Sequence, residues 1–522
     1  MGLWFIILFS ICLCATLKFI LVLLSPTIKT KHTNKLSLPS GPLKLPIIGN
    51  FFWLYKSFSE IESILHNLRQ KYGPIVTLHI GSQPLIFIST PSLAHQALIQ
   101  NGATFADRPP APPSNNIITS NQHNITSATY GPLWRILRRN LTLELFNPSR
   151  VKSYANTRKW VLQIVKTQLK FHVKSNESVH VMKQFQYAMF CLLAFICFGE
   201  KLDEKTITEI EDVERSLLLN FVGMNVLTFL PKLGKIIFRK QWLKLLNLRR
   251  RQEDVEIPLI KARRELKEKK KENHVVQDEA SIPYVDTLLD LQIPDESEGR
   301  KLTDQEIVSL CSEFLNAGTD TTSTALQWIM ANLVKHQEIQ EKLYTEIKSV
   351  IVLNNSSSEE EEISEEDLQK MPYLKAVVLE GLRRHPPGHF VLPHAVTTDI
   401  VLDGHVIPKN ATVNFMVAEM GRDPMVWKDP MEFKPERFLG DGGEVVFDIT
   451  GTREIKMMPF GAGRRICPGL RLAMLHLEYF VANLVKDFKW TAVDGDNVDL
   501  SEKVEFTVVM KNPLEAHVSL RS

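Results

Sequence analysis

A cysteine near the end of the chain lies in a glycine-rich segment that leads directly into a helical pattern. The segment reads PFGAGRRICPG over residues 459–469, and an apolar helix pattern starts at Leu470. Glycines let a backbone pass close to a large planar group, and a helix N-terminus favours a negatively charged sulfur. A lone cysteine in apolar surroundings is more often an inert core residue. The match of the whole segment to one loop design favours a different interpretation, in which Cys467 is a thiolate and Arg465 pairs with an anionic group of a ligand.

A second segment with chemical potential is AGTDTT at residues 317–322, in the middle of a long helical pattern. That pattern begins at a capping box formed by Thr303 and Glu306. Glycine and β-branched threonine are poor helix formers, so one interpretation is a kinked or interfacial helix. The functional interpretation is a local widening that admits dioxygen, with Asp320, Thr321 and a water relaying protons.

A third segment places Glu380 and Arg383 three residues apart on a predicted helix, within reach of each other. Such a pair is common on protein surfaces, where it adds little stability. The preceding residues, 374–379, suggest a largely apolar face, and a buried pair needs additional hydrogen bonds. We therefore expect this pair to have a role in folding and not in chemistry.

These segments, in this order along the chain, resemble the signature elements of cytochromes P450. The cysteine segment matches the haem-thiolate signature F-x-x-G-x-R-x-C-x-G, AGTDTT matches the oxygen-binding helix, and EGLR at 380–383 matches E-x-x-R. WRILR at 134–138 fits the family's W-x-x-x-R helix, and PERF at 435–438 resembles the element whose arginine completes the E-x-x-R network. With the apolar leader and a proline-rich hinge, the resemblance covers essentially the whole chain and is strongest to the plant A-type microsomal group.

The resemblance implies haem b (iron protoporphyrin IX) as the cofactor and Cys467 as the axial ligand of the haem iron. It implies catalytic roles for Asp320 and Thr321. Related sequences often carry a Pro-Arg pair where this chain has Pro393 and His394. A neutral imidazole can donate a hydrogen bond but lacks a fixed charge, so His394 is expected to be a weaker haem contact. The other residues implied at the cofactor are Trp134, Arg138, Arg465, Phe460 and Gly463, and those implied in folding around it are Glu380, Arg383 and Arg437.

The elements that must position these residues are mostly helices. We predict a fold that is mainly α with a minor β region, the cytochrome P450 fold, preceded by one N-terminal transmembrane helix. A hairpin is expected over 76–88, and further strands at 396–401 and 411–417. Helical periodicity predicts helices at about 59–70, 92–100, 131–145, 155–170, 187–198, 206–222, 241–272, 304–335, 336–350, 373–384 and 468–486.

The first residues form an apolar run with one charge, Lys18, between Leu3 and Leu24. As a helix this run spans roughly 33 Å, enough to cross a bilayer core of about 30 Å. It is too long for a cleaved signal peptide and has no basic residue before it. We therefore predict a membrane anchor at 1–25, a basic and proline-rich hinge at 26–50, and a cytochrome P450 catalytic domain at 51–522. Lysines follow the anchor, so the catalytic domain is expected on the cytosolic side of the endoplasmic reticulum membrane, in a single-pass topology.

The composition excludes several other classes of protein. Formal net charge is +3, with 62 basic and 59 acidic residues, so we expect no nucleic-acid partner. Six scattered cysteines without a C-x-x-C pair argue against a disulfide scaffold or a zinc ribbon. The stretch 221–248 mixes apolar and basic residues, which fits either core packing or contact with a membrane surface.

The resemblance to cytochromes P450 implies monooxygenation of a small lipophilic substrate by O2. Electrons are expected from NADPH–cytochrome P450 reductase, because no G-x-G-x-x-G nucleotide fingerprint is evident. The alternatives are a P450-fold isomerase or dehydratase needing no reductase, and a membrane-bound haem sensor or carrier; the Asp-Thr pair argues against both. The sequence leaves the substrate open among fatty acids, terpenoids, phenolics and tetrapyrrole catabolites. The segments that the resemblance assigns to the substrate pocket are 105–125, 217–224, 311–321, 388–392 and 504–509.

Overall fold

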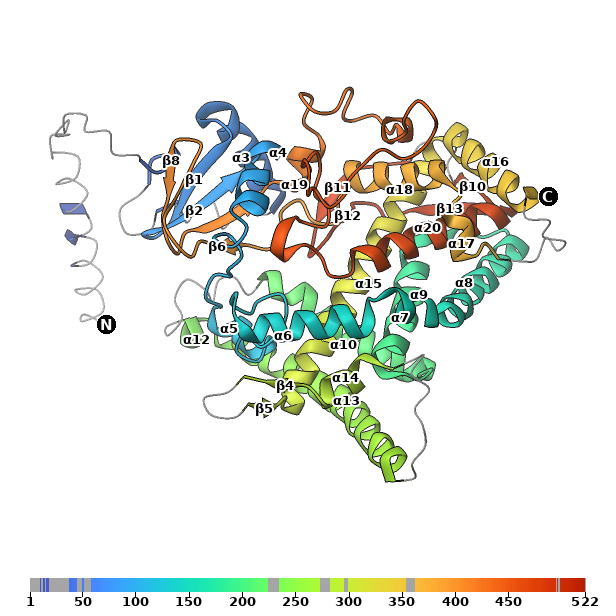
Figure 1. The fold of residues 1–522 in the computed structure, drawn as a ribbon, viewed down its shortest axis with the longest axis horizontal. Coiled ribbons are helices and arrows are strands. Elements are labelled where there is room, and N and C mark those ends of the chain that lie inside the picture. The colour runs from blue at the N-terminus through green and yellow to red at the C-terminus, as the bar shows by residue number, and fades with distance from the viewer. Residues whose placement is uncertain are drawn as a thin grey trace.

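The structure is a computed structural model of the chain. It describes residues 37–44, 49–50, 58–223, 234–272, 282–294, 299–353, 362–493, 495 and 498–521, together with residues 10, 13, 14, 16 and 17. Most of the predicted anchor and much of the predicted hinge lie outside the described residues, as do residues 224–233 of the stretch 221–248. Figure 1 shows a smaller part, rich in strands, beside a larger helical part that α15 crosses.

The central helix is α15, Asp304–Lys335, which contacts helices from distant parts of the sequence. It begins at the predicted capping box, in which Thr303 and Glu306 each bond the other's backbone N–H. Its partners include α9, Val181–Phe198, and α20, Leu470–Asp487. Among the described residues, α9 alone is long and apolar enough to cross a membrane, but most of it is buried inside the fold, as expected of a core helix.

The other predicted helices are present, and the structure adds short helices that were not predicted, at 113–118, 148–153, 234–237, 284–289, 365–368 and 417–421. The segment 92–100 is α4, Pro91–His95, continued by a π-helix, Gln96–Gln100, and 131–145 is α6, Pro132–Asn140, continued by a second π-helix, Leu141–Leu145. The remaining helices are α3 Phe58–Tyr72, α5 Pro113–Ile118, α7 Pro148–Ser153, α8 Ala155–Ser175, α10 Glu204–Gly223, α12 Gly234–Ile237, α13 Arg239–Glu272, α14 Tyr284–Leu289, α16 Gln337–Leu353, α17 Glu365–Leu368, α18 Pro372–Arg384 and α19 Val417–Gly421.

The predicted hairpin is present as β1, Ile75–Ile80, paired antiparallel with β2, Gln83–Ile88. The sheet continues through β9, Thr412–Phe415, to β6, His394–Ala395, in the order β1-β2-β9-β6. Residues 37–41 also attach to this part of the fold, because Thr77 N–H donates to the Ser40 carbonyl oxygen at 3.0 Å. A side chain on Gly41 would lie 1.9 Å from the Thr77 oxygen, so only glycine fits there.

The predicted strand at 396–401 is wrong over most of its length. Only residues 400 and 401 are in a strand, β7 (Ile400–Leu402), which pairs with β8 (His405–Ile407). The physical reason is a polar turn, in which the Asp399 carboxylate accepts from the Lys409 N–H at 2.7 Å. Thr397 N–H bonds instead to the Thr104 carbonyl oxygen at 3.0 Å. The second predicted strand, 411–417, corresponds to β9.

The strands near the C-terminus were not predicted from the sequence. They are short, and one of them pairs with residues 179–180, far away in the chain, so local periodicity carries little information about them. The sheet β10-β13-β3 joins Phe488–Ala492, Glu515–Leu520 and Val179–His180. Two further hairpins are β11–β12, Glu502–Val504 with Val508–Met510, and β4–β5, Gln292–Ile293 with Arg300–Lys301.

Candidate active site

The loop before α20 holds Cys467 in a conformation that depends on glycine. Its backbone closes when Cys467 N–H donates to the Phe460 carbonyl oxygen at 2.8 Å. Gly463 has φ +69°, and a Cβ on this residue would lie 2.0 Å from the Leu98 carbonyl oxygen. Any other residue at 463 would therefore be strained and would collide with the π-helix that follows α4. The loop fixes the cysteine backbone at the start of α20, where the sequence analysis places it.

The electrostatic surroundings of the Cys467 sulfur are more balanced than the sequence suggested. Burial raises the pKa of the Cys467 thiol, whereas the Gly469 N–H and the Arg138 charge act in the opposite direction. The helix N-terminus therefore does not by itself produce a thiolate here. A metal cation bound to the sulfur would supply the missing stabilisation, because coordinating thiols are deprotonated by the metal.

Three arginines gather beside this loop, and one of them was missed in the sequence. Arg138 donates to the Ile466 carbonyl oxygen at 2.5 Å, and Arg465 donates to the Ala106 carbonyl oxygen at 2.7 Å. The missed residue is Arg108, which donates to the Thr126 carbonyl oxygen at 2.7 Å. It stands alone before a proline in a loop, where no helical pattern or charge cluster marks it.

The negatively charged groups near these three guanidinium groups do not balance their positive charge. Burial and the neighbouring Arg465 lower the pKa of Arg108 to about 9, and burial lowers the pKa of Arg465 to about 10. Burial also lowers the pKa of Arg138. Asp107 and Glu313 offset only part of this effect at Arg108. A buried cluster of this kind is stabilised by an anionic ligand.

A second observation points to the same ligand. Trp134 is buried, and its indole Nε1–H has no hydrogen-bond partner among the described residues. The Arg465 guanidinium lies 4.6 Å from the centre of the Trp134 ring. A donor without an acceptor beside buried cations fits the carboxylates of a bound group. The residues therefore fit the two propionates of haem, with Cys467 as the ligand of its iron.

His394 lies close to this cluster but does not present a proton to it. Its Nδ1 lies 2.6 Å from the Phe105 carbonyl oxygen, which can only accept, so the ring proton is on Nδ1. Burial, Arg108 and Arg465 lower the pKa of His394 to about 3, and the ring is neutral at pH 7. Its Nε2 is then an acceptor, so donation from His394 to a propionate would need the other tautomer.

The AGTDTT segment belongs to an unbroken α15. The Thr321 hydroxyl donates to the Ala317 carbonyl oxygen at 2.6 Å, a bond that bends helices slightly. Gly318 faces α9, since a Cβ there would lie 2.6 Å from the Leu193 side chain. Burial raises the pKa of Asp320, and the carboxylate accepts the Thr507 hydroxyl at 2.6 Å. Thr507 is a second residue that the sequence analysis did not single out, although 504–509 was assigned to the pocket.

The predicted ion pair of α18 is fully buried and has the additional hydrogen bonds it needs. Arg383 Nε lies 2.6 Å from the Glu380 carboxylate, and both side chains are inaccessible to solvent. Arg437 also donates to Glu380, at 3.1 Å. The remaining donors of Arg383 reach backbone carbonyl oxygens, among them that of Pro430 at 2.8 Å. This network attaches α18 to the segment 430–437, which precedes Cys467 in the chain.

Several of the predicted pocket segments meet at α15. The Glu313 carboxylate accepts from the N–H groups of Ile125 and Thr126, at 2.9 and 2.6 Å. This contact fixes the end of the segment 105–125 against α15, and Thr507 brings the segment 504–509 to the same helix. Of the segment 217–224, the structure shows Leu217 buried against Leu248 and Ile118.

Comparisons with known proteins agree with this geometry. A family profile described as Cytochrome P450 matches residues 39–519. The chain is 53% identical to cytochrome P450 89A9 of Arabidopsis thaliana over 490 residues, covering 92% of this chain and 93% of that protein. It is 30% identical to a flavonoid 3',5'-hydroxylase of Crocosmia x crocosmiiflora, covering 93% and 92%. A zebra fish cytochrome P450 solved with abiraterone superposes with a TM-score of 0.68 at 21% identity, covering 88% of this chain and 100% of that one.

Proposed function

This chain belongs to the cytochrome P450 family, and we propose that it is a membrane-anchored monooxygenase supplied with electrons by NADPH–cytochrome P450 reductase. Family membership establishes the general class of reaction. The protein is an oxidoreductase with haem, and it uses O2, a redox partner and a small organic substrate. The identity of the reductase, the endoplasmic reticulum membrane and the lipophilic character of the substrate are our proposals.

The observation that supports the proposal most strongly is that one cysteine sulfur lies beside buried arginines whose positive charge is not balanced by nearby carboxylates. Cys467 lies in a glycine-dependent loop beside Arg108, Arg138 and Arg465, and the Trp134 ring under Arg465 carries an N–H without an acceptor among the described residues. Bound haem supplies the O2 and electron-transfer chemistry that protein side chains lack. The chain contributes the sulfur ligand, the propionate contacts and the exclusion of water.

Proton delivery is assigned to α15. Asp320 is the one carboxyl group of the AGTDTT segment, and Thr321 is adjacent to it. The Thr321 hydroxyl donates its proton to the Ala317 carbonyl oxygen of the helix, so its oxygen can hold a water by accepting a hydrogen bond from it. This pair favours a monooxygenase, whose overall reaction consumes protons, over an isomerase or dehydratase, whose overall reaction consumes none.

The pocket segments support a lipophilic substrate. Phe390, Val391 and Phe506 are apolar and incompletely buried. Such walls bind a ligand mainly by removing apolar surface from water, and a few polar groups then fix its orientation. The compound and the carbon atom that is oxidised stay open within this class.

The proposal is tested with full-length protein reconstituted with a plant NADPH–cytochrome P450 reductase in lipid vesicles. We expect NADPH consumption that depends on both proteins and rises with a library of lipophilic plant metabolites. Thr321→Ala should retain haem and convert more of the consumed NADPH into hydrogen peroxide. Reductase-independent conversion of a bound metabolite would support the isomerase instead, and an unchanged peroxide fraction in Thr321→Ala would contradict the relay.

A further inference from the structure

The β11–β12 hairpin places a hydroxyl group directly on the Asp320 carboxylate. Thr507 lies at the turn of this hairpin, 187 residues away from Asp320 in sequence, and its hydroxyl lies 2.6 Å from the Asp320 Oδ2. Thr507 is only 3% exposed. A hydroxyl that deep in the fold must satisfy its own hydrogen bonds, so its partners are determined by the fold and not by solvent.

The direction of the bonds around Thr507 follows from counting protons. A hydroxyl has one proton to donate and can accept further bonds. When Asp320 is ionised, Thr507 must donate to it, so the contact with the Thr324 hydroxyl at 3.2 Å has Thr324 as donor. The three groups then form one chain, from Thr324 to Thr507 to Asp320, in which each bond polarises the next.

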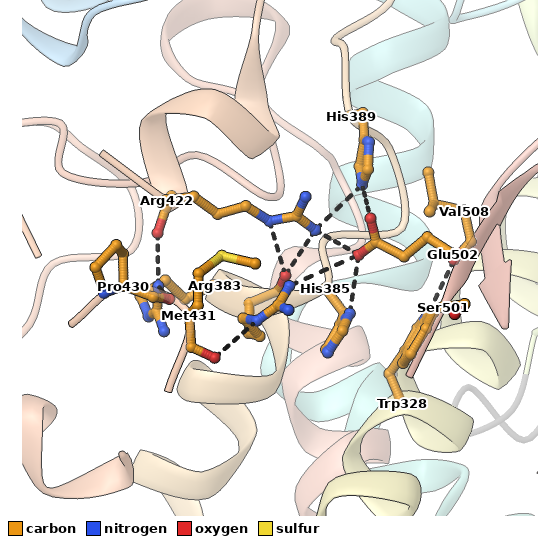
Figure 2. Close-up of polar contacts among 12 residues, drawn as sticks. Trp328, Arg383, His385, His389, Arg422, Pro430, Met431, Ser501, Glu502 and Val508 are labelled. Carbon is orange, nitrogen blue, oxygen red and sulfur yellow. Dashed lines mark hydrogen bonds and ion pairs between the residues drawn. The ribbon is translucent and has the colours of Figure 1, made fainter. Parts of the chain in front are cut away.

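The base of the hairpin is held by a separate polar cluster, so the tip is not free to move. Figure 2 shows the Glu502 carboxylate between His385, His389 and Arg422. The second strand is attached to α15, because the Trp328 indole N–H donates to the Val508 carbonyl oxygen at 2.8 Å. Both strands of the hairpin are therefore fixed, one by its charged base and one by the same helix that carries Asp320.

We propose that Thr507 is the positioning residue of the proton relay, which holds the Asp320 carboxyl group by a hydroxyl supplied from the β11–β12 hairpin. This inference rests on the proposed function, in which Asp320 delivers protons. Thr507 is suited to the task because its hydroxyl can serve both protonation states. It donates to the carboxylate, and after rotation it accepts from the carboxylic acid and donates to Thr324, so Thr507 keeps its own O–H bond in both protonation states of Asp320.

The experiment compares four variants of the full-length holoprotein: Thr507→Val, Thr507→Ser, Thr324→Val and Asp320→Asn. Valine matches the shape of threonine without the hydroxyl, and serine retains the hydroxyl. Thr324→Val is the matched control, since it removes a hydroxyl from the same cluster that does not touch Asp320. Proper assembly of each variant is checked by the ferrous–CO spectrum, and Thr507→Ser covers the case in which valine prevents folding.

The first readout is the infrared C=O band of protonated Asp320, identified by its absence in Asp320→Asn, and followed with pH. The Thr507 bond favours the charged carboxylate, as Arg215 does, while burial and Glu505 oppose it. Loss of the hydroxyl should therefore raise the midpoint of this titration by about one pH unit. Thr507→Ser should restore the midpoint, and Thr324→Val should shift it far less. An unchanged midpoint in Thr507→Val, or an equal shift in Thr324→Val, would overturn the proposal.

The second readout separates this proposal from the proposed function. Hydrogen peroxide formed per NADPH is measured with the reductase in H2O and in D2O. If Asp320 relays protons, Asp320→Asn raises this fraction and Thr507→Val raises it in the same direction, with restoration by serine. If Asp320→Asn leaves the fraction unchanged, the relay itself is refuted, whereas the infrared titration still decides whether Thr507 holds the Asp320 carboxyl.

Discussion

At the scale of single residues, the proposed haem site contains buried polar groups that have no counter-charge or acceptor among the described protein groups. Buried guanidinium groups lower one another's pKa, and the Trp134 N–H has no acceptor among the described residues. Each of these groups has an unfavourable desolvation cost until an anionic partner binds. Binding of haem should therefore stabilise the folded chain as well as equip it for catalysis.

Trp134→Phe tests whether the indole N–H of Trp134 contributes to haem binding. Phenylalanine keeps the aromatic surface beneath Arg465 but removes the N–H that would bond a propionate. Because hydrogen bonds to charged groups contribute about 1.5–3 kcal/mol, we expect haem loss to a scavenging apoprotein to be at least about tenfold faster.

The control is Trp427→Phe. Trp427 is also buried with an Nε1–H that lacks a partner in the described part of the chain, but it packs among Phe438 and Phe447, away from Cys467 in the sequence. Its substitution should leave the rate of haem loss unchanged. Equal rates for Trp134→Phe and the wild-type protein would show that this N–H does not contact the cofactor.

The sequence could indicate those residues of the proposed site that belong to a local pattern, and it missed those that do not. Cys467, Asp320 and the Glu380–Arg383 pair lie in segments whose spacing indicates a loop or a helix face. Arg108 and Thr507 reach the site only through the fold, from a loop and a hairpin turn. His394 was noticed, but the bond that sets its tautomer comes from Phe105, which the sequence does not place beside it.

At the scale of elements, the β11–β12 hairpin shows how a short strand pair is stabilised by charge. The His385 ring, fully buried, lies 2.9 Å from the Glu502 carboxylate and stacks on Trp328 at 3.9 Å between ring centres. His385, Arg422 and His389 act together to lower the pKa of Glu502 to about 2, although burial opposes them. The hairpin is thus attached to the end of α18 and to α15 by one carboxylate and one indole.

Glu502→Gln should make the free energy of unfolding less dependent on pH in the acidic range. The Glu502 pKa is lowered from 4.5 to about 2, so its contribution is complete above pH 4.5 and is lost as the pH falls toward 2. At pH 7 the free energy of unfolding of the variant should be about 3 kcal/mol lower than that of the wild-type protein, measured by urea denaturation in detergent. The difference between the two proteins should narrow below pH 4.5.

Glu515→Gln provides the control, because Glu515 forms an exposed pair with His180. A surface pair contributes about 0–1 kcal/mol, so little change is expected at any pH. A gap between wild type and Glu502→Gln that widened on acidification would contradict the assigned pKa direction.

Helices were easier to predict than strands for a physical reason. A helix such as α15 repeats its pattern over many turns, and its capping box marks the start. The strand β3 is two residues long and pairs with β13 near the C-terminus, and β6, also two residues long, pairs with β9 of the main sheet. Strand pairing is then decided by the packing of the whole domain, which no local window contains.

At the scale of the whole molecule, α12 and the first turns of α13 carry an exposed apolar surface. Ile236 and Ile237 of α12 are 74% and 60% exposed, and Leu243 of α13 is also exposed. Lys235 and Lys240 lie among them. Leu245 and Leu248 of the same stretch are buried, so one face packs on the core while the other is available to a membrane surface.

Deletion of residues 1–25 tests the membrane assignment. We expect most of the truncated protein to move from the microsomal pellet to the supernatant, since the predicted anchor is then absent. A remaining fraction should stay bound in high salt through α12, and Ile236→Asp with Ile237→Asp should release it. Phe171→Asp is the control, because Phe171 is similarly exposed on α8, on the far side of the molecule from α12 (Figure 1).

The central claim is that the Cys467 sulfur binds the haem iron, and the ferrous–CO spectrum tests it most directly. The wild-type protein should show the red-shifted Soret band of a thiolate-ligated haem, and Cys467→Ala should lose that band even when haem is retained. Cys191→Ala, a buried cysteine of α9, should keep it. A red-shifted band that persists in Cys467→Ala, or a wild-type band typical of imidazole ligation, would contradict the account.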